Sequence, residues 1–288
     1  MKIHFVILAA GILAAVMPAS GQQGAQMPAA CRPDKTGQVN QRACADALPV
    51  GSPERALPLI NLGTEAFLNR NFGEAVRLYD EAIPPGKSIV SDVRFHAFRA
   101  GAYSHVGRDA EAYRDARLAL DMLNGKSVEP GVVPATRSVN AGEIYATILP
   151  ILKKNSDPGF PAALAAYTAM PSNSWIDWAN RAGVLDELGE GAAAADASAH
   201  ALALNPTHPA VLNNHCYILA NGGKAMQALP YCQKAIAAAP NEPSIHHSYA
   251  TALALAGKCK HADGELAIAR RLDPSSATYK KPIACKAS

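Results

Sequence analysis

The sequence predicts an all-α protein built from a row of similar helix pairs, on two observations. First, 49% of the 288 residues are hydrophobic but only 6% are aromatic, because the apolar fraction is rich in alanine. Alanine has the highest helix propensity and lets helices approach closely, and the alternating Val, Ile and Thr typical of strands are almost absent. Second, Pro206, Pro240 and Pro274 follow one another at a constant interval of 34 residues, which indicates a repeated structural unit.

Residues 1–21 have the layout of a secretory signal peptide. Lys2 is followed by an apolar run over residues 3–17 and by small residues up to Gly21. The run of about 15 residues is shorter than the ~20 that a membrane-spanning helix needs, which favours export over a membrane anchor. We therefore expect an exported protein without stable membrane insertion, located in the periplasm of a bacterium or, alternatively, secreted.

Three segments can be set in register at the 34-residue interval: residues 175–208, 209–242 and 243–276. A glycine at the fifteenth place predicts the end of a first helix, because glycine accepts a left-handed cap, and the later proline ends a second helix. Small residues at three further places let the two helices of a pair touch. The shared places hold Ala182, Cys216 and Ala250; Gly189, Gly223 and Gly257; Ala194, Ala228 and Ala262; and Ala201, Ala235 and Ala269.

This pattern resembles the tetratricopeptide repeat, whose period and small-residue skeleton it shares. Two upstream segments, beginning near Ala56 and Val93, fit the same pattern, and a further one fits poorly because Pro150 falls inside its first helix. The resemblance implies a right-handed superhelical array of antiparallel helix pairs, with about five good repeats and one degenerate repeat. The expected organisation is a signal peptide at 1–21, an N-terminal segment at 22–55, repeats 1 and 2 at 56–125, a loop at 126–143, the degenerate repeat at 144–173, repeats 4 to 6 at 174–276 and a C-terminal tail at 277–288.

The loop at 126–143 interrupts the repeat spacing and contains two prolines. A plain insertion between two sub-arrays is the simpler interpretation, and a hinge or lid is the functional one. The sequence favours the plain insertion.

Six cysteines follow the signal segment, and an even number in an exported chain favours disulfides over metal sites or free thiols. No C-x-x-C pair is present, which argues against haem attachment, zinc ribbons and thioredoxin-like redox chemistry. Cys216 and Cys232 are equidistant from the turn at Lys224, so an antiparallel helix pair brings them together. We expect a disulfide there, and two buried reduced thiols are the alternative.

The four outer cysteines can be paired less directly, because six cysteines allow many connectivities. Cys259 begins a predicted second helix and could tether the tail through Cys285. Cys31 and Cys44 would then close a small loop before the first repeat.

In tetratricopeptide-repeat arrays the first helices line a concave groove that binds peptides or protein segments. The resemblance places this groove on offsets 2, 5, 9 and 12 of each first helix, which share one face. An Asn beside an aromatic ring suits the binding of an extended backbone, whereas the alternative is a solvated helix face without a ligand. The candidate groove residues and their neighbours are Asp186, Glu187, Asn213, Tyr217, Asn221, His247 and Thr251.

The same offsets near the N-terminus give an unusually apolar set: Leu57, Ile60, Thr64 and Phe67. This set either packs under the N-terminal segment or forms a hydrophobic pocket for a partner, and the sequence leaves both open. The basic and asparagine side chains with which some family members clamp a carboxylate are missing here, except for Asn214.

Signals for other functions are weak. The net charge of +3 is small and scattered, which argues against a nucleic-acid surface. The chain has no phosphate-binding glycine loop and no H-E-x-x-H or G-x-S-x-G motif. His215, His246 and His247 suggest a metal site but lack a third ligand at a convincing spacing.

We therefore predict a non-enzymatic scaffold or adaptor of the cell envelope that binds a protein or peptide partner in its groove, with no cofactor and no nucleic acid. The alternative is an accessory protein that binds a small molecule or a metal through the helix face that carries histidine and tyrosine.

Overall fold

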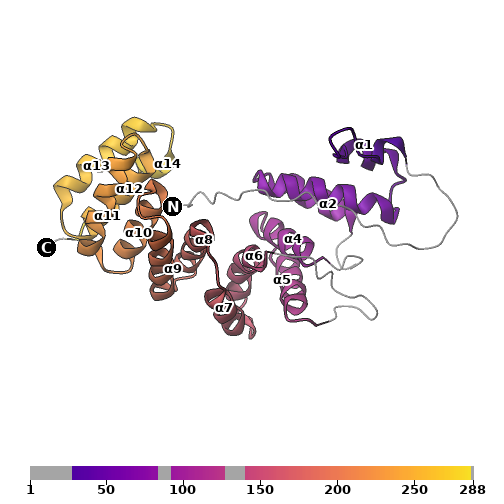
Figure 1. Ribbon diagram of the computed structural model, residues 1–288, viewed down its shortest axis with the longest axis horizontal. Coiled ribbons are helices and arrows are strands. Elements are labelled where there is room, and N and C mark those ends of the chain that lie inside the picture. Colours follow the sequence, from indigo (N-terminus) through magenta and orange to yellow (C-terminus); the bar gives the residue numbers. More distant parts are fainter. Residues whose placement is uncertain (1–27, 84–91, 127–139, 287–288) are drawn as a thin grey trace. The chain divides into compact units, whose positions relative to one another are not determined.

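The computed structural model describes residues 28–83, 92–126 and 140–286, and the described residues form fourteen α-helices and one short 3-10 helix, with no strand (Figure 1). The prediction of an all-α array of helix pairs is confirmed. The predicted signal peptide and most of the predicted loop at 126–143 lie outside the described residues. Within the described ranges, no helix combines the length and hydrophobicity that crossing a bilayer requires.

The chain divides into two compact units, and the boundary between Ala165 and Ala166 lies inside α7 (Phe160–Ala169). In the N-terminal unit, α2 packs against α3 and α4 packs against α5. Pro150 lies in α6, at an exposed position, and the helix continues past it. The elements before α7 are η1 (Ala29–Cys31), α1 (Gln41–Ala47), α2 (Pro53–Leu68), α3 (Phe72–Ala82), α4 (Val93–His105), α5 (Asp109–Leu123) and α6 (Ala141–Lys154).

A buried ion pair joins α4 to α5 in this unit. Arg99, which is 1% exposed, donates from Nε and Nη2 to the carboxylate of Asp115 at 2.5 and 2.9 Å. Its third nitrogen, Nη1, donates to the carbonyl of Ile83 at 3.0 Å, just after α3 ends. The guanidinium therefore links three helices, and all of its charge is compensated inside the unit.

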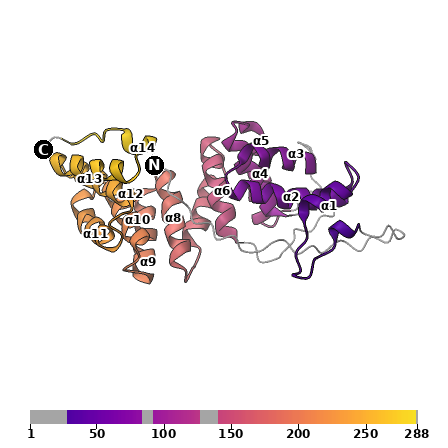
Figure 2. The ribbon, with the colours of Figure 1, turned by 90° about the horizontal axis from the view of Figure 1, so that it is seen from above.

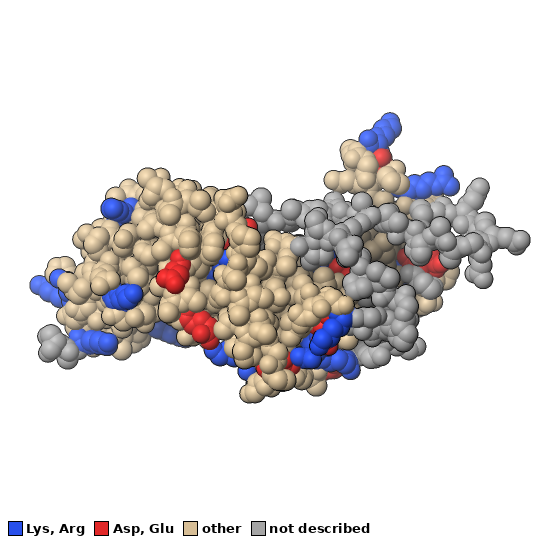
Figure 3. All heavy atoms as spheres, turned by 60° about the horizontal axis from the view of Figure 1, so that its bottom comes forward, with Lys and Arg blue, Asp and Glu red and all other residues tan. Residues whose placement is uncertain are grey.

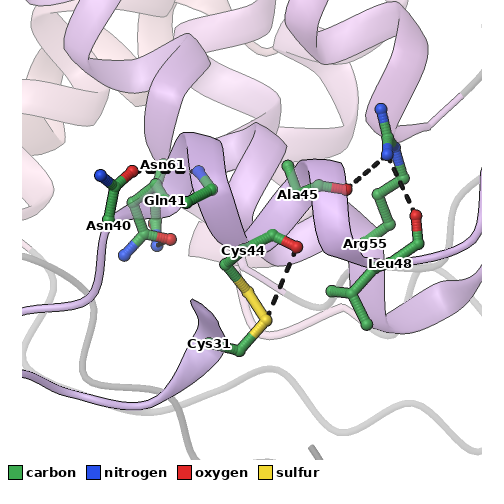
Figure 4. Close-up of a disulfide and its surroundings, with 9 residues drawn as sticks. Cys31, Asn40, Gln41, Cys44, Ala45, Leu48, Arg55 and Asn61 are labelled. Atoms are coloured by element: carbon green, nitrogen blue, oxygen red, sulfur yellow. Dashed lines mark hydrogen bonds between the residues drawn. A yellow bond between two sulfur atoms is a disulfide. The ribbon is translucent and has the colours of Figure 1, made fainter. Parts of the chain in front are cut away.

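The N-terminal segment packs on α2 and is closed by a disulfide between Cys31 and Cys44 (Figure 4). Arg55 of α2 donates to the carbonyls of Ala45 and Leu48 at the C-terminal end of α1 (Figure 4). The disulfide and Arg55 thus fix a helix of only seven residues, too short to be stable alone.

The C-terminal unit contains three successive helix pairs and a short terminal helix (Figures 1 and 2). The second helices end two residues before Pro206, Pro240 and Pro274, because the residue preceding a proline disfavours the helical conformation. The elements are α8 (Trp175–Glu187), α9 (Gly191–Leu204), α10 (Pro209–Asn221), α11 (Ala225–Ala238), α12 (Pro243–Leu255), α13 (Cys259–Leu272) and α14 (Ala277–Lys280).

The first helix of each pair ends at the glycine that the repeat pattern predicts. Gly189, Gly223 and Gly257 have φ values of 74°, 82° and 75°, which side chains rarely allow. After each glycine, the next backbone N–H bonds back to a carbonyl of the last helical turn, as from Lys224 to Leu219 at 2.9 Å. The glycines therefore reverse the chain and start each second helix.

Within each pair the two helices approach through small buried residues. Ala182 and Ser198 are both buried, and Cys216 and Cys232 occupy the corresponding places in the next pair, where they form a disulfide with a Cα–Cα distance of 5.3 Å. Both cysteines are fully buried. The disulfide therefore lies inside the layer of small residues between the two helices and not at the surface.

The tail beyond α13 folds back onto the last helix pair. Arg270 donates from Nε to the carbonyl of Tyr279 at 2.6 Å, and the backbone N–H of Lys286 donates to Ala254 at 3.1 Å. A disulfide joins Cys259 to Cys285, and Ile283 packs against the apolar cluster of α12 and α13. The tail is therefore held at both ends against the final pair.

Candidate functional site

The candidate site is one face of α8, α10 and α12, the first helices of the three C-terminal pairs, which contact one another in this order (Figure 2). Residues three or four positions apart share a face of a helix, so each helix contributes four residues. Glu187 and Asn221 lie beside this face, at the ends of α8 and α10. We call it the first-helix face: Ile176, Ala179, Gly183 and Asp186 of α8; Ala210, Asn213, Tyr217 and Ala220 of α10; and Ser244, His247, Thr251 and Ala254 of α12.

Ala179, Gly183, Ala220 and Ala254 form a buried floor of small residues on this face. Asn213 and His247 are also buried, whereas the other polar and aromatic side chains are only partly covered, so a ligand could reach them. Asp186, Tyr217 and Thr251 are half-buried, and the neighbouring Glu187 and Asn221 are exposed.

Asn213 stands at the centre of the first-helix face and lacks a partner. The residue is 8% exposed, and its amide makes no hydrogen bond to any other residue in the part of the chain that the structure describes. The amide is not among the polar side-chain atoms that are cut off from both solvent and partners, so water or a ligand can reach it. The amide offers both donors and an acceptor, which is the set that an extended peptide backbone satisfies.

Asp186 lies in the last turn of α8, where burial raises the pKa of its carboxyl above the usual range. No other residue in the described ranges forms an ion pair or a hydrogen bond with this carboxylate. The last turn of α8 contains no basic residue, so the negative end of the helix dipole also disfavours the charged form of this carboxyl.

His247, at the α12 end of the face, contacts the tail. Its ring lies 5.3 Å from the ring of Tyr279, and burial lowers the pKa of the imidazole, so it is neutral at neutral pH. Ala254, also on this face, accepts the backbone hydrogen bond from Lys286. The tail therefore contacts the first-helix face at α12.

The other histidines have structural contacts. His215 bonds to the Ser198 hydroxyl at 2.8 Å and is packed edge-on against Tyr231. His246 bonds through Nδ1 to Glu265 at 2.7 Å and through Nε2 to the carbonyl of Pro240 at 2.8 Å. Among the described residues, no three His, Cys, Asp or Glu side chains are grouped so that they could hold a metal ion.

His246 and Trp178 occupy the same place in their repeats and make the same bond. The indole nitrogen of Trp178 donates to the carbonyl of Ser172 at 2.9 Å, six residues earlier, as His246 does to Pro240. This place therefore fastens the start of a first helix to the preceding inter-repeat turn, which is a packing role.

The corresponding apolar set in the N-terminal unit is filled by its own packing. Ile60 belongs to a core cluster that includes Ala45 of α1, and the hydroxyl of Thr64 donates to the carbonyl of Ile60 at 2.9 Å. Phe67 stacks on Phe98 with ring centroids 5.3 Å apart. Of the two expectations for this set, packing beneath the N-terminal segment describes Ile60, while the stacked rings of Phe67 and Phe98 are partly buried.

Two features of the site are absent from the sequence pattern. The contact of Tyr279 with His247 depends on how the tail folds back, and the only signal for it is the pair of cysteines that tethers the tail. The unpaired amide of Asn213 depends on the side chains around it, which a repeat alignment does not describe.

Neither family models nor curated proteins match the sequence. Solved structures do match. One is a tetratricopeptide repeat protein from Parabacteroides merdae, with 15% identity and a TM-score of 0.55 over 83% of this chain and 87% of that one. Another is PilW, a widely conserved type IV pilus biogenesis factor, with 16% identity and a TM-score of 0.54 over 78% of this chain and 96% of that one.

The Cut9–Hcn1 hetero-tetramer of the APC/C also matches, with 13% identity and a TM-score of 0.51 over 83% of this chain and 44% of that one. These identities are too low to transfer a function, but the shared architecture agrees with the repeat register, the glycine caps and the helix pairs. The chain has the fold of the tetratricopeptide-repeat proteins.

Proposed function

We propose that this protein is a non-enzymatic scaffold that binds an extended peptide or protein segment along the first-helix face of its C-terminal unit. It acts in the cell envelope after export, as the three disulfides between described cysteines favour, because disulfides persist in oxidising compartments. Its partners are proteins or peptides, and binding needs no cofactor.

The observation that carries this proposal is the amide of Asn213, which makes no hydrogen bond within the described residues and keeps some contact with solvent at the centre of the first-helix face. A bound backbone would supply both a donor and an acceptor for this amide. Tyr217 lies one helical turn further along the same face and is half-buried, so its ring can cover one side of an extended chain.

The test is to select peptides from a phage-displayed random library on the purified exported protein, and to measure each selected peptide on three variants. Asn213→Ala and Tyr217→Ala should each weaken binding about 10-fold, the equivalent of losing one or two hydrogen bonds or a ring contact. Gln227→Ala, an exposed amide on α11, should leave the affinity unchanged and serves as the control.

Two results would contradict the proposal. One is a selection that enriches no peptide. The other is a set of enriched peptides that bind Asn213→Ala and Tyr217→Ala, with circular dichroism unchanged, as tightly as the original protein.

A further inference from the structure

Building on the proposed function, we infer that the bound segment is cationic: the first-helix face accepts a Lys or Arg side chain, or an amino group, against the carboxylate of Asp186. The inference concerns which segment binds, and three independent features of the described residues support it.

The first feature is the sign of the charges on the first helices. α10 and α12 contain no Asp, Glu, Lys or Arg, so every such charge on these three helices belongs to α8. Its single base, Arg181, is 3% exposed, donates to the carbonyl of Met170 at 2.6 Å and lies over the ring of Trp178. Its acids include Asp186 on the face and the exposed Glu187 next to it. With His247 neutral, the face carries negative charge and no accessible positive charge.

The second feature is the location of the basic residues of the C-terminal unit: apart from Arg181, they lie on α11 and α13, in the turns before these two helices and in the tail. The whole chain has a net charge of +3, so the negative face does not follow from composition. In Figure 3, separate Lys and Arg side chains lie at the end of the C-terminal unit where α13 and the tail lie, and others lie elsewhere on the molecule. The bases on α11, α13 and the tail are Lys234, Lys260, Arg270, Arg271, Lys280, Lys281 and Lys286.

The third feature is the unfavourable position of Asp186 in the free protein. The carboxylate is half-buried and stands at the negative end of α8, and both effects disfavour its charged form. A cation of a ligand would relieve both at once, and hydrogen bonds to charged groups are stronger than neutral ones. An acidic segment would instead meet like charge in a partly desolvated site.

Asn213 and Asp186 have different roles in this arrangement. The neutral amide suits the backbone of any extended segment, so it provides binding without preference for charge. The carboxylate selects among segments, so its removal should abolish the preference for a cation.

The experiment measures three pools of short N-acetylated, C-amidated peptides that are identical except for Lys, Gln or Glu at one central position. Competition fluorescence anisotropy on the full exported chain should rank them Lys, Gln, Glu, with the Lys pool about 10-fold tighter than the Gln pool, the equivalent of one charge-assisted contact. Added NaCl should weaken the Lys pool and leave the Gln pool unchanged.

Asp186→Asn should remove the preference for Lys over Gln, measured as the ratio of the two affinities on the same variant. Asp196→Asn, which removes an exposed carboxylate from α9, should keep the full preference and is the matched control. Because burial and the helix dipole disfavour the charged carboxylate of Asp186 in the free protein, Asp186→Asn should also raise the thermal midpoint at neutral pH. Substitution of a residue that folding requires would lower the midpoint instead.

Each further outcome is decisive. Equal affinity for the Lys and Gln pools, or an Asp186→Asn variant that loses all three pools together, would overturn the cationic preference and leave the proposed peptide-binding function standing. Failure of every pool to bind would overturn the proposed function and this inference with it.

Discussion

At the scale of single residues, the two units contain carboxylates with opposite effects on stability. Asp186 is partly desolvated and forms no ion pair with a described residue, so folding raises its pKa and stability is gained as pH falls through that raised value. Asp115 is fully buried, yet His96 and Arg99 outweigh the burial and hold its pKa below the usual range. Its stabilising contribution is therefore present above the unfolded pKa and is lost as pH falls through the folded one.

We predict that Asp115→Asn lowers the free energy of unfolding of the N-terminal unit by about 3–5 kcal/mol, because it leaves the guanidinium of Arg99 buried without a counter-charge. Urea denaturation at neutral pH measures the loss. Glu74→Gln is the control, since the ion pair of Glu74 with Arg77 is exposed and should be worth about 1 kcal/mol or less.

The cost of Asp115→Asn should shrink in acid, where the original carboxylate is also protonated. The assigned role of the buried pair would be contradicted if Asp115→Asn and Glu74→Gln lowered the free energy of unfolding equally. It would also be contradicted if the effect of Asp115→Asn stayed constant down to strongly acidic pH.

At the scale of helices, the ends of each element are set by a few residues of known conformation. Gly223 has a positive φ, and a Cβ added there would meet no atom within 4 Å, so backbone conformation alone opposes a side chain. Gly191, the first residue of α9, also has open space around a Cβ but is not among the residues with positive φ.

We predict that Gly223→Ala destabilises the C-terminal unit by about 1–2 kcal/mol, the cost of a left-handed conformation for an L-residue. Gly191→Ala should be neutral or stabilise by about 0.4–1 kcal/mol, because it reduces the freedom of the unfolded chain. Thermal denaturation of the two variants side by side measures the difference, and equal shifts would show that the glycine cap does not determine the turn.

The helix ends could be predicted from sequence because they depend on local chemistry. Gly189 and Pro206 end helices through their own backbone geometry, and equivalent residues recur in all three repeats. The approach of Cys216 to Cys232 could be predicted because equidistance from a turn fixes which residues of a helix pair face each other. The unpaired amide of Asn213 could not be predicted, because it depends on all neighbouring side chains at once.

At the scale of the whole chain, disulfides secure the first and last described segments. Cys31–Cys44 closes the segment that packs on α2, and Cys259–Cys285 holds the tail on the last helix pair. Both disulfides fasten short segments that bury little apolar surface. The attachment of these segments therefore depends on a covalent link, whereas a full repeat is held mainly by its packing.

We predict that Cys259→Ser with Cys285→Ser releases the tail while the helix pairs stay folded. Hydrogen exchange at the amide of Lys286 should accelerate strongly, because its bond to Ala254 depends on the tether, and helical content by circular dichroism should hardly change. The lost restraint on a loop of 26 residues corresponds to about 3.5 kcal/mol.

Cys216→Ser with Cys232→Ser provides the comparison, because this buried pair lies inside a repeat and leaves the tail attached. Unchanged protection of Lys286 in the variant without the outer disulfide would show that the non-covalent contacts of the tail are sufficient.

The folded-back tail also determines where such an array can be lengthened. A unit appended after Ser276 would have to displace Tyr279 from His247 and Lys286 from Ala254 before its first helix could dock. A copy of residues 209–242 inserted before Pro243 would instead meet a neighbour of matching register on each side and leave the last pair intact. In evolution or in the laboratory, this chain should therefore grow by duplication in its interior rather than by extension at its end.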